Sequence, residues 1–183
     1  MPSAVFMDRD GTISEEIGYM YDAGLYKPFS YSGPAIRRIN ESGIKAVLIT
    51  NQSGVGRGYF EEAMVQKVHD ILRADLARHG SRFDAIYYCP HLPDAGCDCR
   101  KPLPGMLHRA QRDLDIDLAG SYVVGDKHVD VETAHAVGAK GIQVLTGYGR
   151  EEYESHKHDP HQPHFVAENL TGAVEAILAG VLG

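Results

Sequence analysis

The stretch AVFMDRDGT, residues 4–12, joins an apolar run to a turn that carries two acids. An apolar run bounded by turn residues is typical of a buried strand, and Gly11 allows the chain to turn sharply beyond it. Asp8 and Asp10 therefore come at the carboxyl end of the strand, where open α/β sheets bind ligands. Because positions two apart on a strand share a face, the carboxylates repel each other, and a divalent cation would relieve that repulsion. The alternative is an ordinary Asp-Gly turn with solvated acids.

Length and composition limit the class of protein. The 183 residues suit one domain, so we predict a single domain over residues 1–183. A formal charge of −7 argues against a general nucleic-acid binder. No apolar stretch approaches the roughly 20 residues that span a bilayer, and the first residues lack the regions of a signal peptide. The three cysteines do not suggest a disulfide framework. We therefore expect a cytoplasmic protein without membrane or nucleic-acid partners.

Apolar runs alternate with segments of helical periodicity along the chain. This alternation predicts right-handed crossovers and a mostly parallel sheet, a three-layer Rossmannoid α/β fold with helices on both faces. The expected strands are Ala4–Met7, Lys45–Ile49, Ala85–Tyr88, Tyr122–Val124, Gly141–Leu145 and an edge strand Phe165–Ala167. The expected helices are Gly33–Glu41, Glu61–Arg78, Gly105–Asp113, Val129–Ala136 and Thr171–Leu178. In the second helix, apolar residues at helical spacing are expected to face the core: Met64, Val68, Ile71, Leu72 and Leu76.

Two stretches fit neither kind of element. Residues 14–32 carry scattered glycine and tyrosine and are expected to run as a long loop over the end of the sheet. Residues 151–164 contain four histidines and two prolines. For this second stretch we favour a solvated connection over a metal-binding tract, because no partner segment rich in ligands stands out.

Three more polar segments end on strand tips. Thr50 to Gly54 follow one apolar run and offer a hydroxyl and turn amides to a phosphoryl oxygen. Asp126 follows another run, and a third acid would complete an oxygen-rich magnesium site with the first two. Lys101 supplies a cation, although a surface salt bridge is its ordinary role. Because parallel strands bring their carboxyl ends to one edge, we expect these groups to converge there.

All three cysteines lie near one histidine. Cys89 and His91 are separated by one residue, as are Cys97 and Cys99. Three thiolates and one imidazole suit a closed, tetrahedral Zn²⁺ site, which would be structural because no coordination position is open. The alternative is a set of free buried thiols. Because Arg100 and Lys101 follow directly, a zinc ion here would fix the position of both cations.

Taken together, these motifs resemble the haloacid dehalogenase phosphatase superfamily, over essentially the whole chain and with all four motifs in order. The resemblance implies that Asp8 is the nucleophile, forming a phosphoaspartate, and that Asp10 is the general acid and base. It also implies that Thr50 and Lys101 hold the phosphoryl group. Magnesium would be bound by Asp8, Asp126 and the backbone carbonyl of Asp10, with Asp130 orienting that shell. Lys127 would reach Asp8 or the substrate.

Within that superfamily, the motifs resemble the phosphatases that take the 7-phosphate from D-glycero-D-manno-heptose 1,7-bisphosphate, in making nucleotide-activated heptose for lipopolysaccharide. Histidinol-phosphate phosphatases share the zinc loop and are the alternative within this reaction class. The resemblance implies that Arg57, Arg100 and Glu16–Tyr19 contact the sugar and its second phosphate. The full set of expected substrate-binding residues is Asp8, Arg9, Asp10, Glu16, Ile17, Gly18, Tyr19, Thr50, Asn51, Gln52, Ser53, Arg57, Arg100, Lys101 and Lys127.

Spacing leaves no room for a cap domain. Only about forty residues separate Asp10 from Thr50, and an expected helix and strand use about half of them. We therefore expect a monomeric, capless enzyme whose partner is an extended small-molecule sugar bisphosphate. A catalytically silent phosphate-binding or zinc-stabilised interaction module is the alternative from a different class. The intact Asp8, Asp10, Lys101 and Asp126 argue against it.

Overall fold

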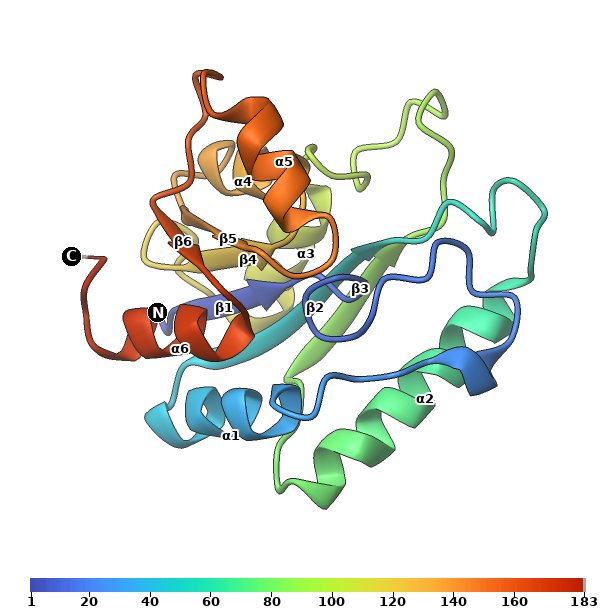
Figure 1. Ribbon diagram of the computed structural model, residues 1–183, viewed down its shortest axis with the longest axis horizontal. Coiled ribbons are helices and arrows are strands. Elements are labelled where there is room, and N and C mark those ends of the chain that lie inside the picture. The colour runs from blue at the N-terminus through green and yellow to red at the C-terminus, as the bar shows by residue number, and fades with distance from the viewer. Residues whose placement is uncertain (183) are drawn as a thin grey trace.

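Six parallel strands form one sheet in the computed structural model, which describes residues 1–182. The spatial order is β3-β2-β1-β4-β5-β6 (Figure 1). The strands are β1 (Ala4–Met7), β2 (Lys45–Asn51), β3 (Ala85–Cys89), β4 (Tyr122–Gly125), β5 (Lys140–Val144) and β6 (Phe165–Ala167). The expected three-layer α/β class is confirmed, and each expected strand is present to within two residues.

Helices cover both faces of this sheet. Figure 1 shows α1, α2 and α6 on one side of the sheet and α3, α4 and α5 on the other. The helices are α1 (Ser32–Ser42), α2 (Glu62–Arg78), α3 (Gly105–Leu114), α4 (His128–His135), α5 (Gly149–His156) and α6 (Leu170–Leu178), with a 3-10 turn η1 (Ala23–Leu25). No helix within residues 1–182 has the length and apolar character to cross a bilayer.

The central strand β1 is apolar throughout because both of its faces are covered. Val5 and Met7 pack into the core beneath α1, α2 and α6, whereas Ala4 and Phe6 pack into the core beneath α3 and α4. All four side chains are fully buried. A strand covered on both sides is therefore a continuous apolar run rather than an alternating one, as this sequence shows.

Two expectations from the sequence were wrong. Residues 151–156, expected in a loop, belong to α5, in which Gly149 is the only buried residue. This helix has no apolar stripe to reveal it, and polar contacts hold it in place: the Glu152 carboxylate accepts a hydrogen bond from the His128 backbone N–H at 2.9 Å. In α2, Ile71 is 38% exposed, and Val65 and His69 are buried instead.

The sheet order creates a switch point between β1 and β4. From β1 the chain proceeds to β2 and β3 on one side, whereas β4 leads to β5 and β6 on the other side. The loops after β1 and β4 therefore diverge, and a crevice opens between them at the carboxyl edge. The residues that follow these two strands are Asp8 and Asp126.

Candidate active site

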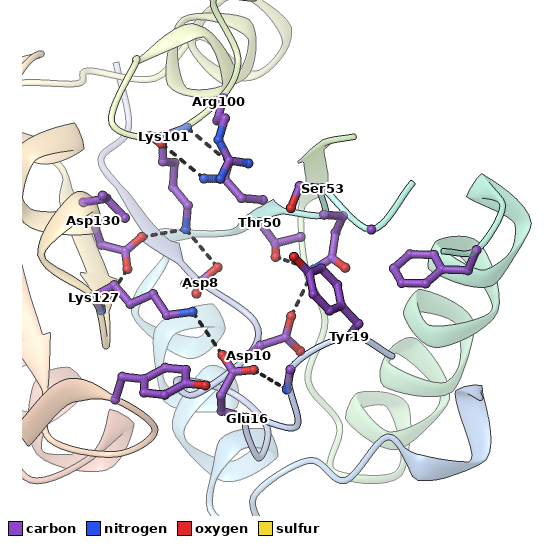
Figure 2. A pocket seen from close by; sticks show the side chains of 17 residues that line it. Asp8, Asp10, Glu16, Tyr19, Thr50, Ser53, Arg100, Lys101, Lys127 and Asp130 are labelled. Carbon is purple, nitrogen blue, oxygen red and sulfur yellow. Dashed lines mark hydrogen bonds and ion pairs between the residues drawn. The ribbon is translucent and has the colours of Figure 1, made fainter. Parts of the chain in front are cut away.

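A cleft of about 420 Å³ lies at this carboxyl edge (Figure 2). It draws residues from the loops after β1, β2, β3, β4 and β5. Twelve of the fifteen expected substrate-binding residues line it, so sequence motifs far apart in the chain meet in one place. The lining residues are Asp8, Asp10, Glu16, Gly18, Tyr19, Thr50, Asn51, Gln52, Ser53, Gly54, Phe60, Arg100, Lys101, Lys127, Val129, Asp130 and Tyr148.

Lys101 is the buried cation at the centre of the site. Its Nζ lies 2.8 Å from Asp8 Oδ1 and 2.6 Å from Asp130 Oδ1 (Figure 2). Burial alone would lower the pKa of Lys101, but the Asp130 and Asp8 carboxylates outweigh burial and raise it. Lys101 therefore stays charged beside Asp8. Asp130, expected to orient the metal shell, holds this ammonium group.

Lys101 comes from the loop between β3 and α3, and Asn51 fixes it against β2. The Asn51 side chain accepts a hydrogen bond from Lys101 N at 3.1 Å and donates one to Lys101 O at 3.2 Å. Both backbone groups of Lys101 are thus held by one amide side chain at the end of β2. The ammonium group needs this precise support, because a loop alone would leave a long, flexible side chain unplaced.

Asp126 is completely buried between two glycines. A Cβ on Gly11 would lie 2.1 Å from Asp126 Oδ2, and a Cβ on Gly147 would lie 2.4 Å from the same atom. Any larger residue at either position would displace the carboxylate. Its Oδ2 accepts a hydrogen bond from the Tyr148 backbone N–H at 2.9 Å, whereas Oδ1 is buried without a partner in the described chain.

The residues around Asp126 fit a divalent cation. Asp8, Asp126 and Asp130 offer carboxylate oxygens within 4.8 Å of one another. Burial, with the neighbouring Asp8 and Asp130 charges, raises the pKa of Asp126 to about 8. Burial also raises the pKa of Asp130 to about 6, although the Lys101 ammonium opposes that rise. A divalent cation that prefers oxygen ligands would offset the repulsion among these carboxylates and would give Asp126 Oδ1 a partner.

Asp10 lies on the other side of the cleft and accepts three hydrogen bonds. Arg9 donates from Nε to Oδ1 at 2.9 Å and from Nη2 to Oδ2 at 2.8 Å. Gln52 Nε2 donates to Asp10 Oδ2 and to Thr50 Oγ1, both at 2.9 Å. The Asp10 carboxylate therefore has a defined position, set by side chains from two different strand ends.

Lys127 pairs with Glu16 rather than with Asp8. Its Nζ lies 3.1 Å from Glu16 Oε2 (Figure 2). The same Nζ lies 4.8 Å from the centre of the Tyr148 ring. Glu16 also accepts a hydrogen bond from Gly18 N at 2.7 Å. These contacts tie the long loop after β1 to the loops after β4 and β5. Burial would lower the pKa of Lys127, but Asp126 and Glu16 raise it, so the ammonium group stays charged.

The four expected zinc ligands come together at the end of β3 and in the loop that follows it. Cys89 Sγ lies 3.7 Å from Cys97 Sγ, and His91 Nδ1 lies 3.3 Å from Cys99 Sγ. All four ligand atoms lie within 4.8 Å of one another, and this donor set fits Zn²⁺. Arg100 donates from Nη1 to the His91 carbonyl at 3.3 Å. The cluster therefore sits directly behind a cation that lines the cleft.

Three expected substrate-binding residues do not line the cleft. The Arg9 side chain is buried and does not line the cleft, and Ile17 also lies outside the lining. Arg57 is exposed beside the Tyr19 ring, 6.0 Å from its centre. The sequence reasoning also missed Gly147 and Tyr148, which bracket Asp126 from the loop after β5. The signal was present, because Gly147 and Gly149 lie in the short segment between β5 and α5.

Similar proteins are known by sequence and by structure. A family model described as HAD-hydrolase-like matches residues 98–173. The D-glycero-beta-D-manno-heptose-1,7-bisphosphate 7-phosphatase of Yersinia pestis is 42% identical over 154 residues, covering 80% of this chain and 81% of that protein. The D-glycero-D-manno-heptose-1,7-bisphosphate 7-phosphatase of Thermosynechococcus vestitus is 38% identical over 185 residues, covering 95% and 94%. The solved D,D-heptose 1,7-bisphosphate phosphatase from B. bronchiseptica, complexed with magnesium and phosphate, matches with a TM-score of 0.90 at 36% identity, covering 97% of this chain and 99% of that one.

Proposed function

The chain belongs to the heptose-1,7-bisphosphate 7-phosphatase family of haloacid dehalogenase-like hydrolases, and from this membership we propose that it removes the 7-phosphate of D-glycero-D-manno-heptose 1,7-bisphosphate. The observation that carries the proposal is the Asp8 carboxylate, held at the cleft by the buried Lys101 ammonium at 2.8 Å. An acid in this position can attack phosphorus, and the ammonium group beside it attracts the phosphoryl oxygens.

Asp8 acts as the nucleophile. Its carboxylate forms a bond to phosphorus as the bond to the sugar oxygen breaks, which leaves a phosphoaspartate. A carboxylate that approaches a phosphate faces repulsion of about 4 kcal/mol per pair of unit charges at 4 Å with an effective dielectric near 20. Lys101 offsets part of that repulsion, and Thr50 donates its hydroxyl to a phosphoryl oxygen. Mg²⁺, held by Asp8, Asp126 and the Asp10 carbonyl, would supply further charge neutralisation when bound.

Asp10 moves the protons. As an acid it gives its proton to the departing sugar oxygen, and as a base it takes a proton from the water that attacks the phosphoaspartate. Its carboxylate lines the same cleft as Asp8 and is 15% exposed at the side chain, so both a substrate and a water can reach it.

Arg100 recognises the far end of the substrate. Among the cations that line the cleft, Lys101 and Lys127 already form ion pairs with carboxylates of the described chain, whereas no such pair is present for Arg100. Its guanidinium is therefore available for the sugar or its second phosphate. This favours a bisphosphate over histidinol phosphate, which carries one phosphate and is the second candidate substrate.

The zinc cluster has a structural role in this proposal. Three thiolates and an imidazole would close the coordination shell of Zn²⁺, so the ion would order the loop that delivers Arg100 and Lys101. We also propose that residues 1–183 form one capless domain, which acts as a monomer in the cytoplasm on a small sugar bisphosphate. A molar mass of one chain from light scattering, unchanged by substrate, is the expected result for the monomer.

Phosphate release tests the function. Purified protein is given the two anomers of heptose 1,7-bisphosphate, fructose bisphosphate and histidinol phosphate, each with magnesium and with EDTA. We expect magnesium-dependent turnover, highest with a heptose bisphosphate and absent in Asp8→Asn. Preference for histidinol phosphate would instead identify the protein as a histidinol-phosphate phosphatase. No phosphate release from any of these compounds would favour a silent phosphate-binding module.

A further inference from the structure

Arg9 is a buried cation behind the cleft. Its side chain is 2% exposed, and its single ion pair in the described chain is with Asp10. On its other side the guanidinium faces the Tyr26 ring, 5.9 Å from the ring centre, and Nη1 has no hydrogen-bond partner among residues 1–182. Burying a guanidinium is unfavourable unless an anion compensates it. The polar contact that the structure shows for the Arg9 guanidinium is therefore the one that holds Asp10.

The contact between Arg9 and Asp10 is a fork. Nε and Nη2 each bind a different carboxylate oxygen, at 2.9 and 2.8 Å, so the plane of the carboxylate is fixed as well as its distance. Without this fork, Asp10 would sit on a tight turn at the edge of an open cleft with freedom to rotate.

Gln52 completes the arrangement from a second strand end. Its Nε2 has two N–H groups and uses one for Asp10 Oδ2 and the other for Thr50 Oγ1. The side chain is buried. One amide therefore sets the distance between the proton-transfer group and the hydroxyl that binds the phosphoryl group.

We propose that Arg9 and Gln52 are positioning residues that dock the Asp10 carboxylate and thereby set the rate at which it protonates the departing sugar oxygen. The inference rests on the proposed function, because it depends on Asp10 as the acid and base. In that step, the O–H bond of Asp10 breaks while the P–O bond breaks, and the electron pair of the P–O bond takes up the proton. A transfer of this kind needs heavy atoms within hydrogen-bond distance, and a displacement of about 1 Å costs about 100-fold in rate.

The test compares two substrates in Arg9→Met. A sugar phosphate needs a proton on its leaving oxygen, whereas p-nitrophenyl phosphate releases a stable phenolate without one. Because kcat/KM covers only the steps through release of the leaving group, the base step does not enter it. We expect kcat/KM to fall about 100-fold for heptose bisphosphate and less than about threefold for p-nitrophenyl phosphate. Arg9→Lys keeps the charge but loses the fork, and should fall in between.

Controls separate positioning from folding. Arg38→Met makes the same chemical change at an exposed ion pair with Glu175 and should leave both substrates unaffected. If Arg9→Met does not fold, Gln52→Met carries the test, because it removes a neutral group and should also shift the ratio of the two substrates. Equal losses for both substrates, or none, would overturn the inference.

Failure of the proposed function gives a different result. If wild-type protein releases no phosphate, or if Asp10→Asn leaves the ratio of the two substrates unchanged, the premise itself is wrong. If Asp10→Asn shifts the ratio and the folded Arg9 and Gln52 variants do not, only the positioning role is excluded.

Discussion

Replacing Asp126 with asparagine should stabilise the metal-free protein while abolishing its response to magnesium. The substitution keeps the size of a fully buried side chain and removes its charge. Asp126, Asp8 and Asp130 offer oxygens within 4.8 Å of one another, and two unit charges at that separation repel by about 3 to 4 kcal/mol at an effective dielectric near 20. In the metal-free protein this repulsion between the carboxylates destabilises the fold, and a bound cation would offset it.

The pKa of Asp126 gives a second measure of the same effect. Burial, then Asp8 and Asp130, raise it from 3.8 to about 8. A carboxyl whose pKa is higher in the folded state opposes folding as pH rises above its unfolded pKa, and the penalty is complete above its folded pKa. The shift corresponds to a ceiling of about 6 kcal/mol at pH 8 and above. We expect about 2 to 3 kcal/mol in practice, because a buried asparagine amide without partners has a desolvation cost of its own.

Thermal unfolding in EDTA from pH 5 to 9 measures this. The wild-type melting temperature should fall through this range, and the Asp126→Asn curve should be flatter and lie about 4 to 12 °C higher at pH 8. Magnesium should then raise the wild-type melting temperature and leave the variant unchanged. Asp70→Asn, at an exposed ion pair with Arg73, is the matched control and should follow wild type. A variant that melts below wild type at pH 8 in EDTA, or that magnesium stabilises equally, would refute the reasoning.

Three further predictions concern the cations and the zinc loop. Lys101→Met leaves Asp8 and Asp130 buried without their partner, so urea unfolding should show a loss of about 3 to 5 kcal/mol; an unchanged midpoint would contradict the importance of this pair. Cys97→Ala, or removal of zinc by chelation, should lower phosphatase activity while far-ultraviolet circular dichroism keeps the native signal; full activity in verified zinc-free protein would exclude the proposed role of the loop. Glu16→Gln weakens the contact with Lys127, and a loss of about 1 kcal/mol should raise KM about fivefold with kcat nearly unchanged, whereas Glu15→Gln should behave as wild type; equal KM values would count against it.

The sheet, and the meeting of most of the expected site residues at one cleft, could be predicted from the sequence. Buried parallel strands are continuous apolar runs, so β1 and β6 were expected with the bounds that the structure has. Because parallel strands end at one edge, the acids and cations at their ends had to meet. The positions of Asp8, Thr50 and Asp126 at this edge follow from the sheet topology, whereas Lys101 lies in the loop after β3 and depends on Asn51 for its position.

Side-chain directions and the polar helix could not be predicted. The direction of Arg9 depends on a turn, and the structure buries it in a two-pronged contact with Asp10, outside the lining of the cleft. Lys127 lines the cleft, as its expected role toward the substrate requires, but its ion pair is with Glu16 and not with Asp8. Glu16 lies in the long loop after β1, whose path no sequence periodicity indicates. Helix α5 has almost no buried apolar surface, so its position depends on contacts such as the stacked rings of His128 and His156, 4.3 Å apart. Tertiary contacts of this kind leave no pattern in the sequence.

The most direct test of the central claim is to look for the phosphoryl group on Asp8. Asp10→Asn lacks the base that activates water, so it should accumulate the phosphoaspartate from p-nitrophenyl phosphate, whose leaving group needs no proton from Asp10. The variant mixed with p-nitrophenyl phosphate and magnesium is quenched in acid, reduced with borohydride and digested with trypsin. In the peptide of residues 1–9, Asp8 is the only carboxyl side chain. We predict homoserine at position 8 only when substrate and magnesium were both present. Rapid release of p-nitrophenolate with peptide 1–9 unmodified throughout, or with the phosphoryl group on another residue, would contradict the account.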